Sequence, residues 1–183
     1  MKTKVLQTSS NSTYTKEVTK IKKKNNDIWI RKNYDFNYII ADDIHYKMKF
    51  FKTYFAPYKF DYEFVDTSLE INCDFVIDTV PVRYTIDNFF KLYKDLLTNV
   101  NMVDVSYHFC FDDGKPANIF YVKNKLLAID ESKLRFSTDK EYIKLKAIEA
   151  GIKYITSIGY WTKFNTPDYI VNKLMQIMNE VYE

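Results

Sequence analysis

The sequence predicts an α+β fold in which a sheet-forming N-terminal lobe precedes a mainly helical C-terminal lobe. Before residue 80, short runs of alternating apolar and polar residues are separated by polar turns, which is typical of antiparallel strands. After Pro81 the apolar residues recur every three or four positions, which is the period of an amphipathic helix. The chain has 183 residues, 46% of them hydrophobic, which suffices for the core of one domain. We therefore expect one domain with two lobes, residues 1–80 and 81–183.

Three antiparallel strands are predicted at the N-terminus. The runs KVLQ, YTKEVTKI and DIWIRKNY alternate in polarity, and the polar turns TSSNST and KKKNN separate them. The densest basic cluster, Lys20 and Lys22–Lys24, precedes Asn25 and Asn26, which favour turns. We interpret this cluster as a solvated hairpin end, with a phosphate-binding patch as the alternative.

A helix and two further strands complete the predicted N-terminal lobe. Residues 42–55 begin with two acidic residues, which suit a helix N-terminus, and place four apolar residues at helical spacing: Ile44, Met48, Phe51 and Phe55. The runs KFDYEFV and EINCDFVIDTV are strand-like and meet at a turn around Asp66. The predicted sheet therefore has five antiparallel strands and one accompanying helix.

Three helices and one hairpin are predicted in the C-terminal lobe. The run TIDNFFKLYKDLL begins with a Thr cap and carries its apolar residues on one face. The runs NIFYV and KLLAID flank a short polar turn and form a hairpin whose second strand ends at Asp130. Pro167 suits the first position of the last helix. A stripe of aliphatic residues predicts another helix over residues 139–158: Ile143, Leu145, Ile148, Ile152 and Ile155.

Composition and charge exclude several classes of protein. A net charge of +3 falls short of the concentrated basic surface of a dedicated nucleic-acid binder. Aromatic residues make up 17% of the chain, which favours a ring-rich core over disorder. Cys73 and Cys110 are too few for a disulfide framework and lack metal-ligand spacing, which fits a reducing compartment. Because neither a signal peptide nor a membrane helix is recognisable, we expect a cytoplasmic protein without a membrane partner.

The stretch DDGKPANIF concentrates charged and turn residues between apolar runs, in a chain with only 3 Gly. It resembles the catalytic loop of protein kinases, His-Arg-Asp-Leu-Lys-Pro-x-Asn, because Asp113, Lys115, Pro116 and Asn118 stand at the matching positions. Asp130 follows 12 residues after Asn118, where the family has its metal-binding Asp-Phe-Gly. The alternative interpretation is a polar turn followed by a strand-end carboxylate.

The resemblance implies a site for phosphoryl transfer from ATP, a reaction in which the protein mainly positions the reactants and neutralises charge. Asp113 would orient or deprotonate the attacking hydroxyl. Lys115 would balance charge on the transferred phosphoryl group. Asn118 and Asp130 would supply the oxygen ligands of Mg²⁺.

A nucleotide-binding lysine is expected on the third strand. The residues WIRK resemble the family's Val-Ala-Ile-Lys strand, which makes Lys32 the candidate to pair with the first two phosphates. Arg31 is the alternative, because a slip of one position exchanges the two faces of a strand. The turn between the first two strands has no glycine, so Ser10 and Asn11 would approach the phosphates with their side chains.

The connector between the lobes is predicted near residues 78–83, and the nucleotide would lie between the lobes. In this arrangement the backbone of Thr79, Val80 and Val82 would hydrogen-bond the adenine. The resemblance covers residues 1 to about 135 as an order of elements, so we expect a minimal protein-kinase-like fold with a reduced helical lobe.

The sequence departs from the family pattern at several positions. The Glu of the helix that follows the third strand is absent, which leaves Asp42 or Asp43 to reach Lys32, or no ion pair at all. Phe111 and Asp112 replace the His and Arg of the catalytic loop, and Asp-Phe-Gly has become Asp-Glu-Ser. We interpret these changes as affecting regulation more than chemistry.

The predicted function is that of an ATP- and magnesium-dependent phosphotransferase, similar to an atypical serine/threonine protein kinase. Lys115 resembles the protein kinases rather than the small-molecule phosphotransferases, so a protein acceptor is favoured. The abundance of Lys, Asn, Tyr and Ile is typical of an AT-rich coding source, such as a low-GC bacterium or its phage. A phage-encoded chain would act in the cytoplasm of its bacterial host.

Two other classes of function stay open. A catalytically inactive pseudokinase that binds or inhibits a host factor would explain the missing Gly-rich loop and the missing helix Glu. A nucleic-acid-binding module would use Lys20–Lys24 for phosphates and Tyr14, Trp29 and Tyr34 as stacking groups.

Overall fold

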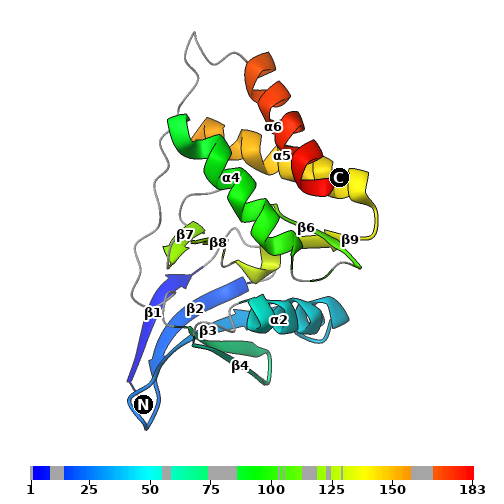
Figure 1. Ribbon diagram of the computed structural model, residues 1–183. Coiled ribbons are helices and arrows are strands. Elements are labelled where there is room, and N and C mark those ends of the chain that lie inside the picture. Colours follow the sequence, from blue (N-terminus) through cyan, green and yellow to red (C-terminus); the bar gives the residue numbers. More distant parts are fainter. Residues whose placement is uncertain are drawn as a thin grey trace. The chain divides into compact units, whose positions relative to one another are not determined.

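The computed structural model has an α+β fold and divides into two compact units, Met1–Thr79 and Val80–Glu183 (Figure 1). Each unit has a core of its own. The structure describes residues 2–8, 15–54, 59–73, 86–102, 104, 106–112, 119–122, 125–128, 130–157 and 167–183.

The first unit is built on a five-stranded antiparallel sheet with the order β1-β2-β3-β5-β4, which confirms the predicted sheet. Strands β1 and β4 form its two edges. Because successive side chains alternate between faces, the register decides which residues lie on the same side of the sheet. The strands are β1 (Lys2–Thr8), β2 (Thr15–Lys22), β3 (Ile28–Tyr34), β4 (Phe60–Val65) and β5 (Ser68–Cys73).

Two tight turns set the register of this sheet. Between β2 and β3, the Lys23 N–H donates to the Asp27 carbonyl at 2.9 Å, and Asn26 has a positive φ of 70°. Between β4 and β5, Asp66 has a φ of 54°. Asn and Asp tolerate this left-handed conformation better than most residues, so both turns lie where the sequence predicted them.

Helix α2 (Asp42–Tyr54) covers one face of the sheet at its β4 edge. Phe51 stacks on Phe60 of β4, with ring centroids 6.3 Å apart. A single helical turn, α1 (Phe36–Ile39), precedes α2. The sequence pattern did not predict α1, because four residues cannot show a helical period. Three residues of the predicted apolar stripe of α2 are buried, Ile44, Met48 and Phe51, and the fourth, Phe55, lies outside the described residues.

In its described residues the second unit contains three α-helices, which confirm the predicted ones. Phe89 stacks between Tyr93 and Tyr154, whose ring centroids lie 5.3 and 4.8 Å from its own. These rings link the first helix to the second and supply part of the core. The helices are α4 (Ile86–Asn101), α5 (Lys140–Ser157) and α6 (Pro167–Tyr182).

The buried side of α5 differs from the predicted stripe. Leu145 is 62% exposed, whereas Ala147, Ala150 and Gly151 are buried. A Cβ atom at Gly151 would lie 2.7 Å from Cδ2 of Leu174 on α6. Of the predicted stripe, Ile143 and Ile155 are buried, whereas Leu145 is not, because the close approach of α6 requires small residues and these lie on another side of α5 from Leu145.

Four short strands lie between α4 and α5: β6 (His108–Phe111), β7 (Ile119–Val122), β8 (Lys125–Ala128) and β9 (Leu134–Ser137). Strands β7 and β8 form the predicted hairpin, although β8 ends at Ala128 and not at Asp130 as predicted. Strand β6 pairs with β9 in an antiparallel pair that the sequence did not predict. Asn101 ties β6 to α4, because its side chain accepts from the Phe109 N–H at 2.8 Å and donates to the Phe109 carbonyl at 2.9 Å.

Both cysteines are buried, and neither forms a disulfide. Burial raises the pKa of the Cys110 thiol, and the Asp112 carboxylate acts in the same direction. Cys110 is therefore an inert core residue. Within the described ranges, none of the helices combines the length and the apolar character needed to cross a membrane.

Candidate functional site

The β6–β9 pair sets the geometry of the region that contains the kinase-like motif. Phe111, the last residue of β6, lies opposite Leu134 of β9. The next N–H, that of Asp112, donates to the Lys133 carbonyl at 2.8 Å. Asp113 follows directly, so the chain enters the predicted catalytic loop from a point beside residue 133.

The β7–β8 hairpin fixes the far end of the same loop. Ile119, which follows Asn118, lies opposite Ala128. Ile119, directly after the predicted loop, therefore holds the first residue of segment 128–133. Asp112, directly before the loop, holds its last residue. Asp130 lies within this segment.

Asp130 is half-buried and caps the short helix η2 (Glu131–Lys133). Its Oδ1 accepts hydrogen bonds from the Ser132 N–H at 3.2 Å and from the Ser132 hydroxyl at 2.8 Å. Oδ2 takes part in neither bond. Because both donors are neutral, they orient the carboxylate without neutralising it, and carboxylate oxygens suit a hard cation such as Mg²⁺.

Asp112 stands where the family has an arginine, and it makes ion pairs with two cations. Its Oδ2 lies 3.1 Å from a terminal guanidinium nitrogen of Arg135 on β9, and its Oδ1 lies 3.8 Å from Nζ of Lys153 on α5. These contacts hold the residue before Asp113 through its side chain as well as through its backbone.

Glu131 is a buried acidic residue that the sequence analysis missed. Its side chain is only 1% exposed. No periodic pattern in the sequence signals this burial, because helix η2 has only three residues.

Strand β3 places Lys32 and Arg31 on opposite faces of the sheet. The register pairs Lys32 with Leu69 and Arg31 with Glu70. Leu69 pairs in turn with Phe64, whose ring lies against α2, so Lys32 lies on the face that α2 partly covers. Arg31 donates from Nε to Oε1 of Glu70 at 2.7 Å. Because Arg31 is held by a buried acid, Lys32 stays the candidate for phosphate binding.

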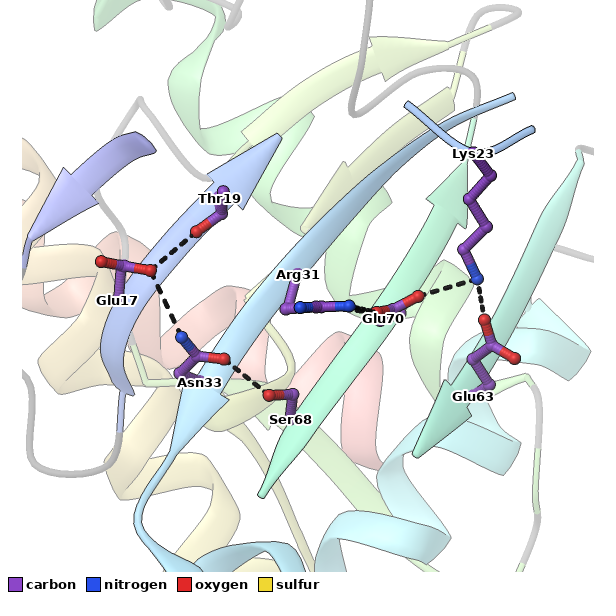
Figure 2. Close-up of polar contacts among 8 residues, drawn as sticks. All are labelled: Glu17, Thr19, Lys23, Arg31, Asn33, Glu63, Ser68 and Glu70. Atoms are coloured by element: carbon purple, nitrogen blue, oxygen red, sulfur yellow. Dashed lines mark hydrogen bonds and ion pairs between the residues drawn. The ribbon is translucent and has the colours of Figure 1, made fainter. Parts of the chain in front are cut away.

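The face that carries Arg31 holds a network of paired charges, shown in Figure 2. Glu70 is only 2% exposed and also lies 2.7 Å from Nζ of Lys23, which makes a second ion pair with Glu63. Burial raises the pKa of Glu70 more strongly than any other single influence. Hydrogen bonds from Lys23 and Arg31 outweigh it and bring this pKa below its ordinary value.

The predicted hairpin-end cluster of lysines is divided in the structure. Lys20 and Lys22 lie in β2, Lys23 is bound to two acids, and Lys24 lies in the turn. The predicted hairpin end is confirmed, because the turn between β2 and β3 follows Lys22, and Lys22 and Lys24 are exposed, whereas Lys23 pairs with two acids. Tyr34 is buried, so it cannot serve as an exposed stacking group for nucleic acid.

Helix α2 buries a lysine on the side where an acidic partner for Lys32 was expected. Lys47 is 3% exposed, and its Nζ lies 3.1 Å from Oδ2 of Asp43 and 5.9 Å from the Tyr38 ring centroid. Asp43 is therefore paired within its own helix, and Asp42 is exposed in the first turn.

Many of the predicted site residues lie outside the described part of the chain. Across the described ranges, no group of three or more His, Cys, Asp or Glu side chains could hold a metal ion. Asp113 and Asn118, two of the three residues predicted as base and Mg²⁺ ligands, lie outside those ranges, so this set stays a prediction. The predicted site residues that lie outside the described part of the chain are Ser10, Asn11, Tyr14, Thr79, Val80, Val82, Asp113, Lys115 and Asn118.

No protein-family model matches this chain, and no curated protein matches it either. A functional conclusion therefore depends on the residues of this chain and on their geometry.

Proposed function

We propose that this chain is an ATP- and Mg²⁺-dependent phosphotransferase with a minimal protein-kinase-like fold. The observation that carries the proposal is the attachment of segment 128–133 at both ends. The Asp112–Lys133 hydrogen bond lies directly before Asp113, and the Ile119–Ala128 pair lies directly after Asn118. Both ends of the loop 113–118 therefore begin beside the segment that contains Asp130.

The order of elements supports the same proposal. A five-stranded antiparallel sheet with a helix after its third strand is followed by a long helix, β6, the loop, the β7–β8 hairpin and Asp130. Apart from β6, which the sequence did not predict, this is the order that the resemblance implies for residues 1 to about 135. The β6–β9 pair adds independent support, because it brings the residue before Asp113 next to Lys133 and played no part in recognising the motif.

In the proposed reaction, the oxygen of an acceptor hydroxyl attacks the terminal phosphorus of ATP. Its proton passes to the Asp113 carboxylate as the bond from that phosphorus to the bridging oxygen breaks and ADP leaves. Lys115 balances charge on the transferred group. Asn118 and Asp130 offer the oxygen ligands that Mg²⁺ prefers, and the bound ion would neutralise the phosphates. Lys115 also favours a protein hydroxyl as the acceptor.

Transfer of labelled phosphate tests the proposal. The chain is incubated with Mg²⁺ and ATP labelled on its terminal phosphate, with casein added as a general protein acceptor. We expect label on the chain or on casein, and a loss of at least about a hundredfold in Asp113→Asn and Asp130→Asn. Asp95→Asn is the matched control, because it removes an exposed carboxylate of α4. Its rate should stay within about twofold of the unmodified chain.

A catalytically inactive nucleotide-binding protein is the second candidate. It is favoured by Lys47, which buries a cation in the helix where active kinases supply an acid to the strand lysine. Thermal unfolding with and without MgATP separates the two candidates. Stabilisation by MgATP without transfer of label supports the second candidate, and the absence of both effects contradicts both.

A further inference from the structure

One face of the first sheet carries four lysines in two directly opposed pairs. Lys2 of β1 lies opposite Lys22 of β2, and Lys4 lies opposite Lys20. Cross-strand partners share a face, so all four side chains extend from the same side of the sheet. We call Lys2, Lys4, Lys20 and Lys22 the lysine face. Lys2, Lys4 and Lys22 are exposed, and Lys20 is half-buried.

The charge of the lysine face is not balanced within its own strands. The one acidic residue in β1, β2 and β3 is Glu17, which lies on the opposite face and accepts hydrogen bonds from Thr19 and Asn33 (Figure 2). Within the described ranges, none of the four lysines makes an ion pair. Like charges directly opposite each other destabilise a sheet, so this pattern favours an external anion as its partner.

Strand β1 is also open along its outer edge. It stands at one end of the strand order, so its outer backbone groups have no strand partner in the described part of the chain. Val5 and Leu6 are exposed. Val5 is adjacent to Lys4 and therefore lies on the other face of the strand. An exposed edge with apolar side chains is a template for the addition of another strand.

We propose that β1 and the lysine face bind an extended segment of a partner protein in which acidic residues alternate with apolar ones. Such a segment would add to the sheet as an antiparallel strand beside β1. Its acidic side chains would lie on the side of Lys2 and Lys4, and its apolar side chains would lie on the side of Val5. The alternation has a period of two over Lys2–Val5, before the register shift between Val5 and Gln7. Only an extended polypeptide reproduces that period on both faces.

Nucleic acid fits this surface less well. Binding of single strands depends on aromatic side chains on which bases stack. Trp29 pairs with Ile21 on the face opposite the lysines, and Nζ of Lys23 lies 3.7 Å from its ring centroid. Tyr34 is buried. The described residues therefore place no exposed aromatic group on the lysine face.

Fluorescence anisotropy with the full chain, in the absence of nucleotide, tests this proposal independently of the proposed phosphotransferase. The probe is a labelled peptide in which Glu alternates with Val and Thr, and its control has the same composition with all Glu residues in one block. We expect the alternating peptide to bind about tenfold more tightly than the block control, since the block control cannot pair both faces. Amide hydrogen exchange at residues 3–7 should slow when it binds.

Substitutions identify the lysines that act. Lys2→Gln combined with Lys4→Gln should weaken binding of the alternating peptide by about tenfold, because two ion pairs are lost. Lys24→Gln is the matched control, since Lys24 is exposed in the turn, and it should change binding by less than about twofold. Circular dichroism verifies that each variant keeps the sheet.

Three outcomes would overturn the proposal. The first is the absence of binding by the alternating peptide, or equal binding of the block control. The second is binding without slower exchange at residues 3–7. The third is tighter binding of an oligothymidylate or of phosphatidylserine vesicles than of the peptide, which would assign the lysine face to a nucleic acid or to a membrane surface.

Discussion

Two carboxylates, Glu70 in the first unit and Asp130 in the second, are held in different ways. Glu70 is buried between the cations Arg31 and Lys23. Asp130 is half-buried, and the donors of its two hydrogen bonds, the N–H and hydroxyl of Ser132, are both neutral. Arg31 and Lys23 balance the charge of Glu70. Ser132 orients the carboxylate of Asp130 but does not balance its charge. The first arrangement is suited to hold the fold, and the second is suited to bind a cation.

The largest effect on stability is expected from Glu70→Ala. The substitution removes the buried carboxylate with which Arg31 and Lys23 pair. Because both cations then lack this partner, the free energy of unfolding should fall by about 2–3 kcal/mol. Urea denaturation measures this change. Glu63→Ala removes the exposed end of the same network and should cost less than about 0.5 kcal/mol. Equal losses of unfolding free energy in Glu70→Ala and Glu63→Ala would show that burial of Glu70 does not increase its contribution to stability.

Gly151→Ala tests whether the second unit depends on helix packing rather than on paired charges. The new Cβ would lie 2.7 Å from Leu174 Cδ2 and 3.2 Å from Tyr93 Cε1, so two buried side chains would have to shift. We expect the free energy of unfolding to fall by about 1–2 kcal/mol. An increase in stability, the usual result of Gly→Ala in a helix, would contradict the close contact between α5 and α6.

Asp112→Asn is expected to have a smaller effect. It removes the ion pairs with Arg135 and Lys153, which are partly exposed, so the free energy of unfolding should fall by about 0.5–1 kcal/mol. The Lys146–Glu149 pair of α5 provides a control, and Lys146→Gln should leave the free energy of unfolding nearly unchanged. A much larger loss of unfolding free energy in Asp112→Asn would show that Asp112, like Glu70, stabilises the fold strongly.

The smallest effect is expected from pH. The pKa of Glu70 is lower in the folded chain than its ordinary value of 4.5. A lowered folded pKa means that the charged form stabilises the fold above pH 4.5 and that this contribution is lost as the pH falls through the folded pKa. The difference in unfolding free energy between the unmodified chain and Glu70→Gln should therefore be constant at neutral pH and shrink in acid. A difference that grows in acid would reverse the sign of the pKa shift.

Much of the fold could be predicted because it depends on periodic patterns along the chain. Helices α2, α4 and α6 follow apolar stripes that a short stretch of sequence already contains, such as Ile44, Met48 and Phe51 in α2. Strands β6 and β9 have four residues each, which is too short for a period to be recognised. Their pairing joins segments far apart in the sequence and cannot be read from either one.

The buried charges could not be predicted for a related reason. Glu70 is buried only because Arg31, 39 positions earlier, and Lys23 lie next to it in the folded sheet. Lys47 lies within an apolar stripe, and its sequence position gives no sign that Asp43 holds it in the core. The kinase-like motif could be recognised in the sequence, whereas the attachment of segment 128–133 depends on the β6–β9 and β7–β8 pairs.

The most direct measurement of the difference between Glu70 and Asp130 is calorimetric titration of ATP with Mg²⁺ present and with Mg²⁺ removed by chelation. We predict that Mg²⁺ tightens ATP binding by at least about tenfold in the unmodified chain and in Glu70→Gln. In Asp130→Asn this dependence on Mg²⁺ should be lost while the variant stays folded. An unchanged dependence on Mg²⁺ in Asp130→Asn would contradict a cation-binding role for this carboxylate.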